Sequence, residues 1–180
     1  MNKIKIRNYQ IFNTIFVFAL GTLLHFVYDW SGQNQIIGAF SAVNESTWEH
    51  LKLIYFPMLI TIIIGFFYLG KNTSNFMCSK TIGLLVALAF TVIFFYTYTG
   101  ILGKNIAIID ISSFFIAVLL GEFISYLLII NNFNCNNKVG TFILTLFFIL
   151  FVVFTYNPPK IGLFKDPISG NYGTMSKFIR

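Results

Sequence analysis

Five long apolar segments, separated by short polar ones, constrain this chain more than any other feature of its sequence. An apolar run of roughly 20 residues is long enough to cross the hydrocarbon core of a bilayer as a helix. Only 10% of the residues are charged, against about 25% in an ordinary soluble domain. The sequence therefore predicts an all-α, polytopic membrane helix bundle with about five transmembrane helices. We expect these helices at approximately residues 11–29, 46–69, 81–100, 106–130 and 139–156.

The chain divides into a transmembrane domain, residues 1–156, and a short irregular C-terminal tail outside the membrane, residues 157–180. Pro158-Pro159 and Asp166-Pro167 break the tail into extended and turn pieces. The first apolar run is longer than the roughly 7–15 residues of a signal-peptide core, so we interpret it as a transmembrane helix.

Basic residues stand in ones and twos near the ends of the apolar segments, a pattern that favours contact with lipid headgroups and not with nucleic acid. The cluster Lys3, Lys5 and Arg7 predicts a cytoplasmic N-terminus, and five spans then place the tail outside the cell membrane. In that orientation Cys78 and Cys135 share the cytoplasmic face. Because thiols are kept reduced there, we expect no disulfide between them.

The densest group of polar residues runs from Asn44 to Lys52, at the start of the second span. Its structural interpretation is a helix start. Ser46 and Glu49 have the capping-box spacing, in which the glutamate reaches back to the serine backbone. Glu49 and Lys52 would form a surface pair at i, i+3, and Trp48 would anchor the helix at the membrane interface.

The functional interpretation is a polar pocket at one membrane face. An odd number of spans brings His25 and Asp29, at the end of the first span, to the face that holds residues 44–52. Glu45 would share a helical stripe with Glu49, about 100° from His50, unless the helix begins after Glu45. The candidate pocket consists of His25, Asp29, Asn44, Glu45, Trp48, Glu49, His50 and Lys52.

Two imidazoles and two carboxylates in this pocket are suitable ligands for a divalent metal ion, the one cofactor for which the sequence offers candidates. The candidate ligands are His25, Asp29, Glu49 and His50. No His-Glu-x-x-His motif is present, and the Glu45–His50 spacing differs from the Glu-x-x-His of di-iron bundles.

Glu122 stands alone within the fourth span, where a carboxylate is costly and commonly functional. We expect no lysine or arginine at similar depth, and therefore a protonated, neutral side chain. It would be hydrogen-bonded between helices or would serve as a proton or cation relay. Pro57 lies inside the second span and removes one helical hydrogen bond, to the carbonyl of Leu53.

Three stretches together resemble a small bacterial family of integral membrane proteins of unknown function. They are His25–Trp30, Asn44–Lys52 with Pro57, and the tail from Pro158 to Gly173. The resemblance covers nearly the whole chain. It implies a membrane fold and brings no activity, substrate or cofactor.

Three functions are compatible with these features. The first is an integral membrane protein that binds a small solute, an ion or a lipid headgroup in the pocket. The second is a metal-dependent membrane enzyme acting on a lipid-like substrate. The third is a structural or accessory membrane subunit, in which the polar stretch only caps a helix. Besides the lipid bilayer, the sequence identifies no partner and no oligomeric state.

Overall fold

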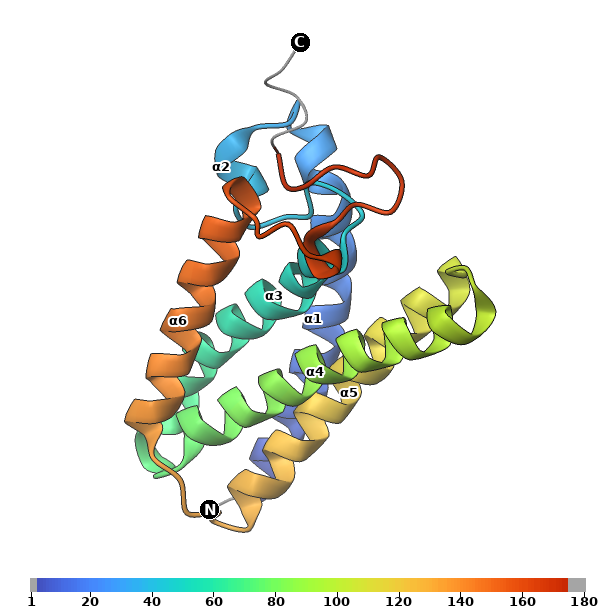
Figure 1. Cartoon of the computed structure of the whole chain (residues 1–180). Coiled ribbons are helices and arrows are strands. Elements are labelled where there is room, and N and C mark those ends of the chain that lie inside the picture. Colours follow the sequence, from blue (N-terminus) through green and yellow to red (C-terminus); the bar gives the residue numbers. More distant parts are fainter. Residues whose placement is uncertain (1–2, 175–180) are drawn as a thin grey trace.

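Helices make up most of the chain in the computed structural model, which describes residues 3–174 (Figure 1). Five of the helices are long and apolar enough to cross a membrane, and the described residues contain no strand, so the predicted all-α bundle is confirmed. The α-helices are α1 (Lys3–Trp30), α2 (Gln35–Gly38), α3 (Thr47–Tyr68), α4 (Phe76–Leu102), α5 (Ala107–Ile130) and α6 (Asn137–Tyr156). Two 3₁₀ turns, η1 (Gly70–Asn72) and η2 (Gly162–Phe164), follow α3 and α6.

Helix α4 begins at Phe76, five residues before the expected start of the third span. The polar residues ahead of it make specific bonds instead of forming a loose loop. Asn75 Nδ2 donates to the carbonyls of Leu128 and Phe133, each at 3.0 Å. Because the helix starts early, Lys80 lies inside it and its side chain is fully buried.

Helices α4 and α5 form an antiparallel hairpin whose distal end projects from the rest of the bundle (Figure 1). They approach most closely where Gly83 faces Gly121. A Cβ atom added to either glycine would overlap the other's carbonyl oxygen. Small residues of this kind allow two helix backbones to touch within a membrane protein.

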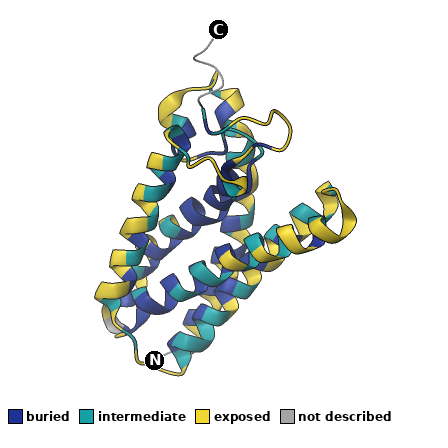
Figure 2. Ribbon diagram, viewed as in Figure 1, coloured by how far each residue is buried: buried dark blue, intermediate teal, exposed yellow. Residues whose placement is uncertain are grey.

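Helix α3 runs through the interior, and its buried residues continue along α4 (Figure 2). Large apolar side chains such as Phe12, Ile64 and Phe142 point outward instead. An apolar exterior of this extent is compatible with lipid as the surrounding solvent. Inside, the carbonyl of Leu53, which Pro57 leaves without its helical donor, lies against Gly21 of α1.

The tail returns to the end of the bundle where α1 ends, α3 begins and α6 ends, which we call the mouth (Figure 1). Phe164 of η2 is buried, with its ring 4.7 Å from that of Trp48. The amide of Thr174 donates to Thr155 O at 3.2 Å, and Asn44 Nδ2 donates to Gly173 O at 3.3 Å. The expected tail extends beyond residue 174, and that last part lies outside the described residues.

Cys78 and Cys135 form a disulfide, so the prediction of two free thiols is wrong. The asparagine-rich segment before α6 brings Cys135 to the first turn of α4. There Asn137 Oδ1 accepts from the Cys78 amide at 3.1 Å, and the backbone of Gly140 packs against Cys78.

We expect Gly83→Leu to destabilise the bundle by about 1–3 kcal/mol, the usual cost of overpacking a close contact. The leucine would separate α4 from Gly121 of α5. Gly100→Leu is the matched control, because it lies in the same helix and a Cβ there meets nothing within 4 Å. Thermal unfolding of the purified variants in one detergent measures the difference. Equal melting of the two variants would contradict the close helix contact.

Candidate metal centre

The start of α3 decides which polar side chains of residues 44–52 face one another. Ser46 is the N-cap, with its Oγ accepting from the Glu49 amide at 3.4 Å, and Asn44 Oδ1 accepts from the Ser46 amide at 2.8 Å. The helix begins at Thr47. Glu45 therefore precedes the helix and leaves the helical stripe of Glu49, so its carboxylate can turn toward His50.

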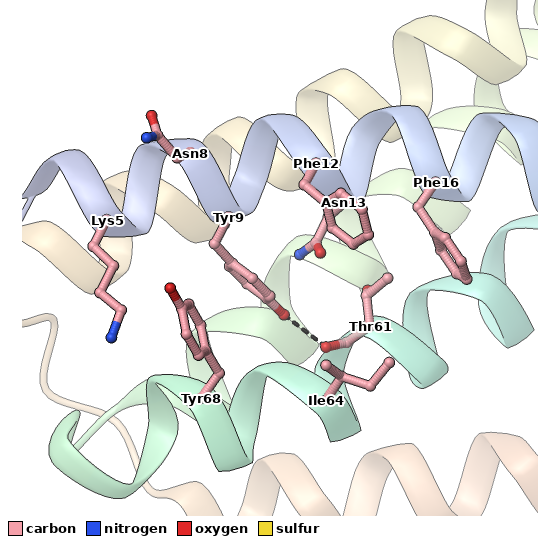
Figure 3. A pocket seen from close by; sticks show the side chains of 9 residues that line it. All are labelled: Lys5, Asn8, Tyr9, Phe12, Asn13, Phe16, Thr61, Ile64 and Tyr68. Carbon is pink, nitrogen blue, oxygen red and sulfur yellow. Dashed lines mark hydrogen bonds between the residues drawn. The ribbon is translucent and has the colours of Figure 1, made fainter.

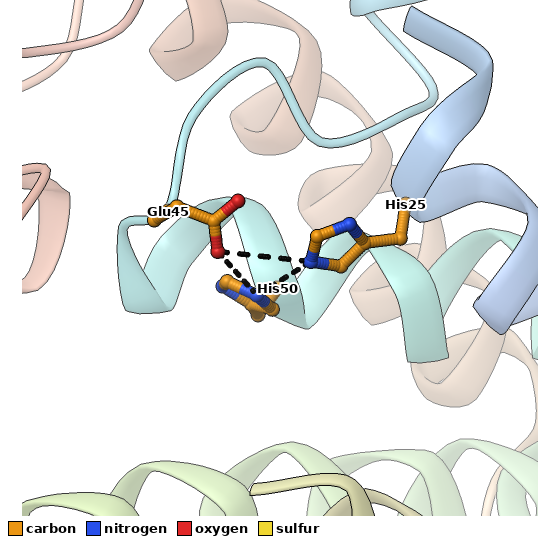
Figure 4. Close-up of side chains that lie close together, drawn as sticks. All are labelled: His25, Glu45 and His50. Atoms are coloured by element: carbon orange, nitrogen blue, oxygen red, sulfur yellow. Dashed lines mark hydrogen bonds and ion pairs between the residues drawn. The ribbon is translucent and has the colours of Figure 1, made fainter. Parts of the chain in front are cut away.

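Three side chains from three segments meet at the mouth and form the His-Glu-His cluster (Figure 4). His25 comes from the last two turns of α1, Glu45 from the loop before α3, and His50 from the first turn of α3. The two Nε2 atoms are 3.3 Å apart. Glu45 Oε2 lies 3.4 Å from His50 Nε2 and 3.7 Å from His25 Nε2.

The tautomer of His50 is set by its other ring nitrogen. Nδ1 lies 3.0 Å from the carbonyl oxygen of Ser46, and only a protonated Nδ1 can donate to that acceptor. In the neutral ring Nε2 then carries the lone pair, whereas the protonated ring donates from Nε2 to Glu45. A backbone carbonyl that holds the second nitrogen is a common way to orient a metal-binding histidine.

The spacing of the three atoms fits a small tetrahedral ion. Zinc binds histidine nitrogen and carboxylate oxygen at about 2.0–2.2 Å, and two ligands at a tetrahedral angle are then about 3.3–3.5 Å apart. Two of the observed separations, 3.3 and 3.4 Å, fall in this range, and the third is 3.7 Å. Three protein ligands would leave the fourth position open, as in catalytic zinc sites.

The charge of the cluster is suited to a cation. Hydrogen bonds from His25 and then His50 hold the pKa of the Glu45 carboxyl well below its usual value, so Glu45 is ionised at neutral pH. The side chains are 31%, 42% and 34% exposed for His25, Glu45 and His50. An ion or a small substrate can therefore reach the cluster from solution.

A groove of about 490 Å³ borders the cluster, and we call it the tail groove. Glu45 belongs to both, because it lines the groove as well. One wall consists of Phe95 and Tyr96 of α4. The other consists of tail residues between Lys165 and Gly170. Glu45 thus connects the cluster to a space large enough for a small molecule or a lipid headgroup.

Glu49 and Lys52 form the mouth pair, which is separate from the cluster. Lys52 Nζ lies 2.5 Å from Glu49 Oε2, and both side chains are almost completely buried, so the predicted surface pair is wrong. Lys52 also donates to Gly38 O at 2.7 Å and to Thr155 Oγ1 at 2.9 Å. Glu49 accepts from the Val43 amide at 3.0 Å, where a complete capping box would use Ser46. The mouth pair thus joins α3 to α2 and α6.

The remaining pocket candidates have other surroundings. Asp29 accepts a bond from Gln33 at 3.4 Å and is not part of the cluster. Trp48 is 7% exposed and packs on Phe151 with the ring centroids 4.5 Å apart, so it is a core residue and the predicted interfacial anchor is wrong. Asn44 positions Ser46 and the tail, as described above.

Glu122 has a basic partner, contrary to the expectation that none lies at its depth. Lys80 Nζ is 2.5 Å from Glu122 Oε2 and donates to Gln10 Oε1 at 2.9 Å. Gln10 in turn donates to Ser125 Oγ at 2.8 Å. This inner pair ties α4 to α5 and, through Gln10, to α1.

Sequence reasoning omitted Glu45 from the metal ligands and Lys80 from the buried charges. The signal for Glu45 was the N-cap preference of Ser46, which starts the helix only after Glu45. The signal for Lys80 was weaker, since Asn75 and Ser79 have the composition of a loop.

One known protein family matches almost the whole chain. A family model described as "Family of unknown function (DUF6512)" matches residues 1–174. No curated protein and no solved structure matches the chain.

We expect Lys52→Met to lower stability by about 3–5 kcal/mol, because it leaves the Glu49 carboxylate buried without its partner. Replacing both residues, Glu49→Leu with Lys52→Met, should recover part of the loss. Lys165→Met, on the exposed tail, is the control. Chemical or thermal unfolding in detergent measures the effect, and a double variant no more stable than Lys52→Met would argue against the pairing.

Proposed function

The chain belongs to DUF6512, a family of unknown function, and we propose that it is an integral membrane protein that binds a divalent transition metal ion. The ligands are His25, Glu45 and His50, and zinc fits them best. The near-tetrahedral spacing of the three ligand atoms is the observation that carries the proposal. The five apolar helices and the apolar exterior support the membrane location.

The tail groove favours a second function, a metal-dependent enzyme acting on a lipid-like substrate. A zinc ion with three protein ligands supplies a bound water with a pKa near 7, which is a nucleophile at neutral pH. The groove offers the Lys165 ammonium for an anionic headgroup and the Phe95 ring for apolar atoms. Tyr96 OH accepts from Thr47 Oγ1 at 3.4 Å and so connects the α4 wall to the start of α3 beside Glu45.

A purely structural role would explain the mouth pair. It would not explain the His-Glu-His cluster. Glu49 and Lys52 are buried and join helices, as a structural role requires. The cluster is partly exposed and joins two imidazoles through facing nitrogens. Helix packing alone does not need that arrangement, whereas an ion between the nitrogens does.

We expect protein purified without chelator to retain about one zinc ion per chain, and His25→Ala or Glu45→Gln to lose it, because a three-ligand site tolerates no missing ligand. Asp29→Asn is the matched control, since Asp29 is an exposed carboxylate outside the cluster. Elemental analysis measures the metal. Affinity should fall as pH falls, because protons compete for the imidazole nitrogens.

Wild-type protein that takes up no zinc, cobalt or manganese at neutral pH would refute the metal site. Metal retained in full by both cluster variants would refute the assignment of its ligands.

The orientation with a cytoplasmic N-terminus stays a prediction based on Lys3, Lys5 and Arg7. The disulfide between Cys78 and Cys135 favours the opposite orientation, because disulfides persist in oxidising compartments. We expect no thiol to react in denatured, unreduced protein and both to react after reduction. A membrane-impermeant maleimide, added to intact cells after mild reduction, then shows on which side of the membrane Cys78 and Cys135 lie. Labelling from outside would put the N-terminus outside, and thiols free before reduction would contradict the disulfide.

A further inference from the structure

A second groove lies at the end of the bundle opposite the mouth, between α1 and α3 (Figure 3). It has a volume of about 390 Å³, and we call it the α1–α3 groove. Its lining residues are Lys5, Asn8, Tyr9, Phe12, Asn13, Phe16, Thr61, Ile64 and Tyr68. None of these residues belongs to the cluster or to the tail groove, so this site is independent of the proposed metal function.

Asn13 gives this groove a polar group in need of a partner. Its side chain is 0% exposed, and neither amide atom has a hydrogen-bond partner within the described part of the chain. Figure 3 shows the amide between Tyr9, Phe12 and Thr61, on the groove wall. An unpaired buried amide is costly, and a molecule in the groove that reached Asn13 would find both a donor and an acceptor there.

Tyr9 forms the inner wall of the groove, and its ring is fixed by contacts with α3. Tyr9 OH donates to Thr61 O at 2.7 Å, and its ring rests on Gly65 of α3, where any Cβ would overlap it. On the far side of that ring lies Lys80 Nζ, 5.3 Å from the ring centre. Tyr9 thus separates the groove from the inner pair.

The chemistry of the groove changes along its length. Lys5 and Tyr68 lie at its outer end, with Lys5 Nζ 4.1 Å from the Tyr68 ring centre. Asn13 is eight residues further along α1, about 12 Å deeper. Phe12 and Ile64 are 57% and 55% exposed and give the groove apolar flanks. A charged outer end with apolar flanks further in matches the charged headgroup and the apolar chains of a phospholipid.

The charge of this end of the molecule is complementary to an anionic lipid. Its basic residues outside the inner pair are Lys3, Lys5, Arg7, Lys71 and Lys138. Five of the six acidic residues belong to the mouth, the tail or the α4–α5 turn, and the sixth, Glu122, pairs with Lys80. Nothing at this end therefore neutralises a headgroup phosphate except lysine and arginine.

We propose that the α1–α3 groove binds one anionic phospholipid, with its phosphate at Lys5, an ester carbonyl accepting from Asn13 Nδ2, and an acyl chain along Phe12 and Ile64. The lipid supplies the partner that the Asn13 amide lacks. It also covers the apolar flanks of the groove, between the N-terminal half of α1 and the C-terminal half of α3.

Native mass spectrometry of purified, delipidated protein titrated with phosphatidylglycerol tests this site. We expect one tightly bound lipid per chain, and weaker binding of phosphatidylcholine. Ile64→Trp should block the groove and reduce binding to the nonspecific level. Ile93→Trp is the matched control, because Ile93 is an outward-facing isoleucine of α4 away from the groove.

Two milder variants test the polar contacts. Asn13→Leu should weaken binding about fivefold, the usual effect of one neutral hydrogen bond. Lys5→Gln should weaken phosphatidylglycerol binding about fivefold and phosphatidylcholine binding less, with Lys104→Gln, an exposed lysine at the other end of the bundle, as its control. Equal binding by Ile64→Trp and Ile93→Trp would overturn the site. Equal affinity for both lipids would overturn the charge selectivity, and unchanged binding by Asn13→Leu would overturn the role of the amide.

Discussion

A charge buried among apolar helices requires an opposite charge beside it, and two buried ion pairs of this kind stabilise the bundle. Lys80 and Glu122 join α4 to α5, and Gln10 extends the bond to α1. Lys52 and Glu49 lie on one helix, yet Lys52 also bonds Thr155 of α6 and Gly38 of α2. In a low-dielectric interior, removing one partner of such a pair costs far more than the pair itself contributes. The two pairs therefore specify which helices are neighbours.

The charged and titratable side chains at the mouth fall into two groups, those paired inside the protein and those that can still bind a ligand. Glu49 and Lys52 are within the candidate stretch, but their contacts within the protein are complete. His25, Glu45 and His50 are different, because their contacts are mainly with one another and the side chains remain partly exposed. The two imidazole nitrogens lie 3.3 Å apart with the Glu45 carboxylate beside them, an arrangement of donor atoms that suits a shared cation.

Hydropathy was sufficient to predict the five long helices, because a membrane-length apolar run has few other stable structures. The side-chain partners of Lys80 and Glu45 could not be predicted from hydropathy. Lys80 was assigned to a loop from its polar neighbours, whereas Asn75, just before the helix, donates to the carbonyls of Leu128 and Phe133, far along the chain. The sequence left open whether Glu45 shares the helical stripe of Glu49, and the N-cap at Ser46 places Glu45 before the helix, where it faces His50. Contacts of this range depend on tertiary structure.

Thr155 connects the buried framework of the mouth with the groove beside the cluster. Its hydroxyl accepts from Lys52, and its carbonyl accepts from the Thr174 amide of the tail. The tail forms one wall of the tail groove through Lys165 and the turn at Asp166, whose Oδ1 accepts from the Ile168 amide at 3.0 Å. The position of that wall thus depends on α6 being held by Lys52. A change in the mouth pair would consequently alter the groove, and through the bond between Glu49 and the Val43 amide it would also reach the loop that carries Glu45.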